Sequence, residues 1–273
     1  MKIEFFDSHC HFDFEDFNSE RVNSQGVNLE SGAGTRLAQW QECNALGVTG
    51  LLVPGVEPAQ WPVAKALAAD MPGLVYGVGL HPWWIMPNVP NEPLAQQAAG
   101  FLTDSRCVAI GECGLDAKID CSMSVQLAIL EQHLQLAEAS RKPLIVHVRS
   151  AHNELLRCLK RYKLPEGGVV HGFSGSLQQA QDYWALGFYL GIGGTITYAR
   201  AKKTRHTVAA MPLEALVLET DAPDMPPFGF QGETNHPRNI VYVAQMLAEL
   251  RSESLATVAA QTWLNSQKLF GLK

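Results

Sequence analysis

The stretch FFDSHCHF, residues 5–12, places His9 and His11 two positions apart at the end of a short apolar run. In an extended chain such residues share a face and lie about 6 to 7 Å apart, so both imidazoles can reach one cation. Cys10, between them, is expected to point away as a small buried side chain. Asp7 precedes them, either to orient an imidazole or to form a buried hydrogen bond. The spacing predicts part of a metal site.

Other ionisable residues also follow apolar runs. They are His81 in GVGLHPWW, Glu112 in VAIGECGLD, His147 in PLIVHVRS, His171 in GGVVHGFSGS and Asp221 in LVLETDAP. A single histidine or aspartate in such a place is usually a structural residue or a helix cap. Several of them at the carboxyl ends of separate strands instead favour a common metal site.

The predicted ligands are four imidazoles and two carboxylates. They are His9, His11, Glu112, His147, His171 and Asp221. One catalytic zinc-like ion needs three protein ligands and a water, so this set predicts two divalent ions. Such ions lie roughly 3.5 to 4 Å apart and share a carboxylate, for which Glu112 on the central fourth strand is the natural candidate. Zn²⁺, Mg²⁺ and Mn²⁺ all stay open, and we expect no organic cofactor.

The elements that must position these residues are eight short β-rich runs separated by helical segments. We expect strands at 3–9, 48–55, 74–80, 107–112, 143–148, 168–171, 188–193 and 215–220. In the helical segment 124–141, Leu127, Leu130 and Leu134 repeat at three- and four-residue steps. The pattern predicts an α/β fold, a TIM-like (β/α)8 barrel, as a single domain over residues 1–273. A doubly wound sheet is the alternative, but no GxGxxG turn follows the first run.

Composition sets limits on the class of protein. With 47% hydrophobic and 18% charged residues, the chain is typical of a globular protein with a large core. No run approaches the ~20 apolar residues of a membrane helix, and no secretory signal is evident. Six scattered cysteines without a CxxC pair favour reduced thiols in the cytoplasm. A net charge of -6 argues against wrapping long duplex DNA.

Seven sequence pieces resemble, in order, the TatD family of metal-dependent deoxyribonucleases in the amidohydrolase superfamily. They are DSHCH, GLHPW, GECGLD, PLIVHVR, HGFSGS, GIGG and LETDAP, and they span nearly the whole chain. The resemblance implies that His9, His11 and Asp221 hold one ion, that His147 and His171 hold the other, and that Glu112 bridges them. It also implies hydrolysis of nucleic acid, from a 3′ end of single-stranded DNA. The oligomeric state stays open.

The expected chemistry is attack of a metal-activated water on a phosphodiester. Asp221 is expected to act as general base as well as ligand. Glu219, on the same strand face, either accepts a hydrogen bond beneath the site or forms a buried structural pair.

Four residues are expected to contact the substrate. Arg149 lies two residues after His147 and either binds a phosphate or forms a surface salt bridge. His81 either contacts the substrate or belongs to a loop anchored by its neighbouring tryptophans. Lys202, in YARAKKTRH, lies in a run that is either a phosphate site or a solvated helix face. Asn235 lies in GETNHPRN, where the chain departs from the Asn-Glu-Pro pattern frequent in the family.

Three further expectations concern the loops and the rivals to this function. The longest irregular segments, 13–34, 83–93 and 222–237, follow strands and should lie at the catalytic mouth. Phe12, Phe14 and Phe17 in the first of them either stack on bases or pack in the core, which is the commoner role. The rival activities are hydrolysis of an ester or amide, such as a D-aminoacyl-tRNA or a small cyclic amide, and a non-catalytic metal-binding scaffold.

Overall fold

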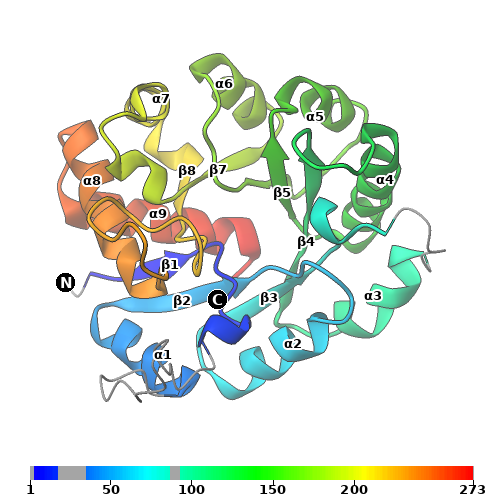
Figure 1. Cartoon of the computed structure of the whole chain (residues 1–273), viewed down its shortest axis with the longest axis horizontal. Helices are drawn as coiled ribbons and strands as arrows, with labels where there is room; N and C mark the ends of the chain where they lie inside the picture. Colours follow the sequence, from blue (N-terminus) through cyan, green and yellow to red (C-terminus); the bar gives the residue numbers. More distant parts are fainter. Residues whose placement is uncertain (1–2, 18–34, 87–92, 273) are drawn as a thin grey trace.

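The computed structural model describes residues 3–17, 35–86 and 93–272, and its framework is one sheet of eight parallel strands (Figure 1). The strands are β1 (Phe5–Asp7), β2 (Val48–Val53), β3 (Leu74–Val78), β4 (Cys107–Asp116), β5 (Leu144–Arg149), β6 (Gly168–Val170), β7 (Phe188–Ile192) and β8 (Leu216–Leu218). Each strand pairs in parallel with the next along the chain. This order confirms the predicted TIM-like barrel.

A helix follows every strand, and these helices lie around the outside of the strands (Figure 1). They are α1 (Arg36–Ala45), α2 (Trp61–Asp70), α3 (Leu94–Leu102), α4 (Met123–Ser140), α5 (His152–Leu159), α6 (Leu177–Ala185), α7 (Lys202–Ala210) and α8 (Ile240–Arg251). A last helix, α9 (Leu255–Phe270), packs against β1 and β8.

Helix α4 shows how local sequence fixes these elements. The Ser122 side chain accepts a hydrogen bond from the backbone N–H of Val125 and so caps the first turn. Leu130 and Leu134 are buried on the face that meets the sheet. Arg141 ends the helix in the left-handed region at φ 53°. The predicted three- and four-residue repeat is therefore confirmed.

The barrel interior is filled by apolar side chains at the amino ends of the strands. This interior cluster is separate from the larger core between strands and helices, and it consists of Phe6, Leu52, Val108, Ala109, Ile145, Val169, Tyr189, Val217, Leu269 and Phe270. Because Leu269 and Phe270 end α9, the last turn of this helix packs into the interior cluster. The rings of Phe6 and Phe270 lie 5.9 Å apart. Polar side chains are thus left to the opposite, carboxyl end.

Two strand boundaries differ from the sequence prediction in ways that shape the site. Strand β1 ends at Asp7 rather than at position 9, because the Asp7 carboxylate accepts the backbone N–H of His9 and draws the chain out of the strand. Strand β4 does not end at Glu112 but continues to Asp116, and its register against β5 shifts around Glu112. Gly111 takes φ 132° there, and a Cβ would collide with the carbonyl oxygen of a β5 residue.

The barrel closes where the ends of β1 and β8 meet, and we call these contacts the seam. Asp7 accepts hydrogen bonds from the backbone N–H of Thr220 at 2.9 Å and from its Oγ1 at 2.6 Å. One step further, the backbone N–H of Asp221 donates to the carbonyl of His9 at 2.9 Å. The seam therefore brings together two segments at opposite ends of the sequence, and both carry predicted ligands.

The predicted loop positions 18–34 and 87–92 lie outside the described residues, whereas 222–237 is described and is irregular apart from the start of a short 3-10 helix at its end. All six cysteines are free thiols, five of them buried. Among the described helices, none combines the length and apolarity needed to cross a bilayer.

Candidate metal centre

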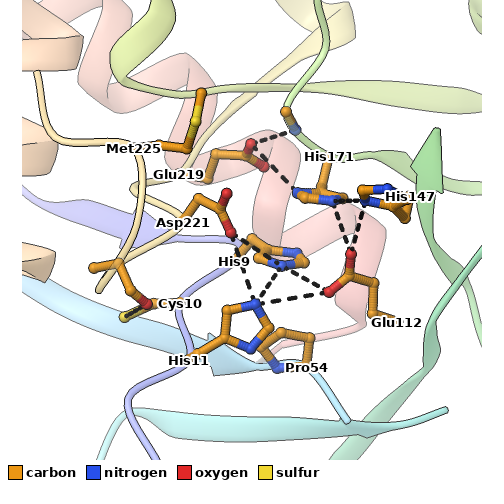
Figure 2. Close-up of polar contacts among 12 residues, drawn as sticks. His9, Cys10, His11, Pro54, Glu112, His147, His171, Glu219, Asp221 and Met225 are labelled. Carbon is orange, nitrogen blue, oxygen red and sulfur yellow. Dashed lines mark hydrogen bonds and ion pairs between the residues drawn. The ribbon is translucent and has the colours of Figure 1, made fainter. Parts of the chain in front are cut away.

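The six predicted ligands converge at the carboxyl end of the barrel (Figure 2). They come from five strands and the loops that follow them: His9 and His11 after β1, Glu112 in β4, His147 in β5, His171 after β6 and Asp221 after β8. Three groups of side chains have donor atoms within 4.8 Å of one another: His9 with His11 and Glu112, His9 with His171 and Asp221, and His81 with Glu112 and His147. Sequence reasoning therefore selected residues that the fold brings together.

Glu112 lies at the middle of the cluster, and its two carboxylate oxygens face different imidazoles. Oε2 lies 3.2 Å from His9 Nε2 and 3.7 Å from His11 Nε2. Oε1 lies 2.8 Å from His171 Nε2 and 3.4 Å from His147 Nδ1. A carboxylate with one oxygen toward each pair of nitrogens has the geometry of a ligand shared by two ions.

The two histidines of the opening stretch face each other at the first of these positions. Their Nε2 atoms lie 3.3 Å apart, although both residues follow the end of β1. Asp221 Oδ1 lies 3.6 Å from His9 Nε2 and 3.7 Å from His11 Nε2. Asp221 has φ 57°, in the left-handed region, at the point where the chain turns away from the seam. Two nitrogens and two carboxylate oxygens thus surround one point, as the predicted first ion requires.

His81 is a member of the cluster that sequence reasoning assigned to the substrate. Its Nε2 lies 3.3 Å from Glu112 Oε1, and its Nδ1 accepts the backbone N–H of Trp83 at 3.1 Å. An acceptor at Nδ1 places the proton of the neutral ring on Nε2, toward the carboxylate. The ring is buried and lies 4.4 Å from that of His147. His81 thus touches the centre directly as well as anchoring its loop.

The ionisation of the cluster suits metal binding. Burial lowers the pKa of His9 to about 4 and those of His11 and His81 to about 3, so these rings are neutral at pH 7 and keep a free lone pair. Burial opposes ionisation of Glu112, but the nearby imidazoles, His171 foremost, hold the pKa of this carboxyl well below its usual range. The neutral rings of His9, His11 and His81 are fitting donors for Zn²⁺ or Mn²⁺. Burial opposes protonation of His171, but Glu112 raises the pKa of this ring to about 10, so His171 has to release a proton when it binds an ion.

Asp116 is a site residue that sequence reasoning missed. It is fully buried at the end of β4, and its Oδ2 lies 3.4 Å from His147 Nε2. The same oxygen accepts the indole N–H of Trp83 at 2.8 Å, and Oδ1 accepts the backbone N–H of Lys118 at 2.8 Å. A carboxylate behind a ligating histidine fixes the orientation of the ring. Asp116 is the last residue of the GECGLD piece, and this position is the feature of the sequence that points to a role at the site.

The other acidic and sulfur groups of the opening prediction have structural roles. Asp7 bonds to the seam and to the backbone of His9 rather than to an imidazole, and burial raises its pKa to about 7. Cys10 is buried in the core, as expected. Glu219 lies beneath His171, but its Oε1 is 4.0 Å from Nδ1 of that ring and accepts the backbone N–H of Gly172 at 2.5 Å. Burial raises the pKa of Glu219 to about 8.

The structure contradicts the assignment of Asn235 to the substrate. This side chain is buried, and its amide donates to the carbonyl oxygens of Thr220 and Met225 at 2.8 and 3.3 Å. Its Oδ1 accepts from the backbone N–H of His236 and from the Asn239 amide. The residue ties the last loop to the end of β8, and both amide hydrogens and the oxygen are already used.

Arg149 and Lys202 lie at the rim of the barrel. Arg149 is exposed at the end of β5 and makes no side-chain ion pair with the residues that the structure describes. Lys202 is exposed at the start of α7 and does not line the central cavity. In the same run, Arg205 donates to the carbonyl of Ile196 at 2.6 Å, so this side chain has a structural contact. Contact of Arg149 and Lys202 with a substrate stays a prediction.

A cavity of about 90 Å³ opens over the cluster. Five predicted ligands line it together with His81, Val56, Asp224 and three large rings, those of Phe14, Trp83 and Trp84. Phe14 stacks on His11 with ring centroids 4.6 Å apart, whereas Phe12 and Phe17 are buried in the core, as expected of most of this loop. The reacting centre is therefore small and has partly apolar walls.

Comparisons with known proteins agree with this architecture. The family model described as TatD related DNase matches residues 6–271. An uncharacterized metal-dependent hydrolase of Escherichia coli K12, YjjV, is 40% identical over the full length of both chains. A relative in Haemophilus influenzae with the same description is 38% identical over 98% of this chain and all of its own.

The structural comparison leads to the same family. The crystal structure of YjjV, a TatD homologue from Escherichia coli K12, superposes with a TM-score of 0.88 at 39% identity and covers both chains entirely. The family model, the relatives and the similar structure thus all cover nearly the whole chain, including every residue of the centre. The chain therefore belongs to the TatD related DNase family of metal-dependent hydrolases.

Proposed function

We propose that the protein is a deoxyribonuclease that hydrolyses phosphodiester bonds at the 3′ end of single-stranded DNA, with two divalent ions at the centre. The observation that carries the proposal is the position of Glu112: its Oε2 faces His9 and His11, and its Oε1 faces His147, His171 and His81. Two-ion sites of this kind suit in-line displacement at phosphorus, because both the attacking and the leaving oxygen need stabilisation. The family description supports the substrate class.

In this proposal the first ion is held by His9, His11 and Asp221 and the second by His147 and His171, with Glu112 shared. When bound, the ions would lower the pKa of a water to about 7 and offset charge on the phosphoryl oxygens. His9 and His11 contribute neutral nitrogen donors, because burial keeps both rings unprotonated at neutral pH.

Asp221 takes the proton from the attacking water. Its Oδ1 faces the first pair of histidines, and burial raises the pKa of this carboxyl to about 7, although nearby His171 opposes the rise. A base whose pKa lies near the working pH combines an available lone pair with enough proton affinity. Asp116 holds the ring of His147 in place from behind, at 3.4 Å.

The surroundings of the centre favour a nuclease over the rival functions. A non-catalytic metal-binding scaffold tolerates the loss of some ligands, whereas all six predicted ligands are present here. A small ester or amide fits a closed pocket, whereas this cavity lies beneath an open rim where Arg149 is exposed. We also place the protein in the cytoplasm, since its six cysteines are free.

The test uses the purified full chain, stripped of metal and reloaded with Mg²⁺, Mn²⁺ or Zn²⁺. We expect release of nucleotides from single-stranded DNA with a free 3′ end, and loss of at least about 1000-fold in kcat for Glu112→Gln, which keeps the size of the side chain. The matched control is Glu131→Gln on α4, whose partner is the exposed Arg161. Equal rates for wild type and Glu112→Gln would refute the centre. Cleavage of a D-aminoacyl ester but not of DNA would refute the substrate.

A further inference from the structure

We propose that the exposed face of Trp83 is a stacking platform for the base of the terminal nucleotide, and that it binds bases without distinguishing them. The inference rests on the proposed nuclease function, because it assigns a part of the substrate to a part of the rim. Trp83 belongs to the short 3-10 helix Pro82–Trp84, directly after β3 and His81.

The indole of Trp83 is exposed and yet held in place. Its side chain is 56% exposed, although an apolar ring of this size is usually mostly covered. Its indole N–H donates to Oδ2 of the buried Asp116 at 2.8 Å, and its backbone N–H donates to His81 Nδ1 at 3.1 Å. A ring fixed before binding loses little conformational entropy when a ligand covers it. Such pre-organisation is expected of a binding surface and is not needed for a ring left in solvent.

The platform adjoins the reacting centre. Trp83 lines the same cavity as Glu112 and His147. The ring of His81, whose Nε2 lies 3.3 Å from Glu112, meets the Trp83 ring edge to face, with centroids 5.4 Å apart. A phosphate at the centre would therefore place the attached nucleoside within reach of the indole.

The size of the cavity decides which part of a nucleotide enters. Its volume is about 90 Å³, well below the roughly 300–1,000 Å³ of pockets that enclose a whole drug-sized ligand. That space holds a phosphoryl group, and a whole nucleotide is too large for it. Phe14 and Trp84 also line the cavity, so the base has to lie outside, where the exposed face of Trp83 is available.

The contacts of the indole also predict what kind of recognition occurs. Because Asp116 already accepts the only polar hydrogen of the Trp83 side chain, the ring offers a π-face and no donor to a base edge. Stacking on an aromatic side chain tolerates any base and contributes about 1–3 kcal/mol per base. We therefore expect similar KM values for the four terminal bases and a higher KM when the base is missing.

The experiment compares oligonucleotides that end at the 3′ side in an ordinary nucleotide or in an abasic one with the same phosphodiester. For wild type, we expect the abasic end to raise KM about 10-fold, which corresponds to ~1.4 kcal/mol of stacking. Trp83→Leu should raise KM about 10-fold for the ordinary end, leave KM for the abasic end within about twofold, and keep the bound metal per chain unchanged. Trp83→Phe, which keeps a ring, should fall between wild type and Trp83→Leu.

The control is Phe228→Leu, which removes an aromatic side chain that is 66% exposed and does not line the cavity. It should leave both KM values unchanged. The platform is refuted if wild type hydrolyses both ends with equal KM, if Trp83→Leu raises KM equally for both, or if Phe228→Leu reproduces the effect. Wild type that cuts neither oligonucleotide would refute the nuclease function itself, which is a different and recognisable result.

Discussion

Asp116 Oδ2 lies 3.4 Å from His147 Nε2, on the edge of the ring opposite the one that faces Glu112. The same oxygen accepts the indole N–H of Trp83. One buried carboxylate is therefore in contact with a proposed metal ligand and with the wall of the cavity. The pKa of Asp116 is held below its ordinary range: burial would raise it, but the hydrogen bonds, that of His147 first, outweigh burial.

Asp116→Asn should weaken metal binding about 10- to 100-fold, because the ligand loses the charge that orients it and raises its basicity. Competition with a chelating dye measures the dissociation constant for Zn²⁺ or Mn²⁺. Asp120→Asn, at an exposed position in the following turn, is the control and should bind as wild type does. Unchanged affinity in Asp116→Asn would show that the carboxylate serves only the fold.

Removing metal should lower the melting temperature of the protein. A ligand that binds only the folded chain stabilises it by about 2.7 kcal/mol when its free concentration is 100 times the dissociation constant. Thermal melts with and without chelator measure the shift, and Glu112→Gln should lose most of it. Identical melts of the wild type in both conditions would contradict a metal site at the positions of His9 and His11.

Thr220→Val should lower the free energy of unfolding by about 1–3 kcal/mol. The substitution keeps the shape of the side chain but removes the Oγ1–H that donates to Asp7 across the seam, and it leaves a buried carboxylate oxygen without that partner. Urea denaturation gives the difference. Thr103→Val, at an exposed helix end, is the control and should change stability by less than about 0.5 kcal/mol.

His133 should make the protein less stable in mild acid. This buried ring accepts the backbone N–H of Leu80 at 2.9 Å, and burial lowers its pKa from 6.5 to about 4. Below pH 6.5 the unfolded chain binds a proton on this histidine, whereas the folded chain binds it only near pH 4. The free energy of unfolding is therefore highest above pH 6.5 and falls as the pH is lowered from 6.5 to about 4. The loss is at most about 3 kcal/mol.

Urea unfolding at pH 7 and pH 5 of wild type and His133→Gln measures that contribution. The variant should lose less stability between the two pH values than the wild type does. His206→Gln, exposed on α7, is the control and should follow the wild type. Parallel losses in wild type and His133→Gln would contradict the role of this histidine.

The ligand set was predictable because it depends on where apolar runs end. His147 and Asp221 follow such runs, and parallel strands of a barrel carry their carboxyl ends to one side. The i, i+2 spacing of His9 and His11 also gave the right neighbours, although β1 has already ended there. The direction of the chain and the order of the strands are therefore enough to predict that these ligands lie together.

The remaining features depend on contacts that no local pattern reports. The shift in register around Glu112 lets β4 continue to Asp116, and hydrophobic periodicity does not reveal such an irregularity. Asn235 was misassigned because its partners, Thr220 and Met225, come into reach only when the last loop folds back. His81 belongs to the centre through the contact of its Nε2 with Glu112, which no local pattern in the sequence reports.

The seam has a consequence for synthesis of the chain on the ribosome. His9 and His11 emerge first, but Asp221 joins them only after β8 has been made, and α9 must still pack against β1 and β8. A nascent polypeptide therefore carries the two histidines of the proposed first ion site before Asp221 has been made. The proposed centre is assembled only after β8 and Asp221 have been made, so products that terminate before β8 lack one of its carboxylates.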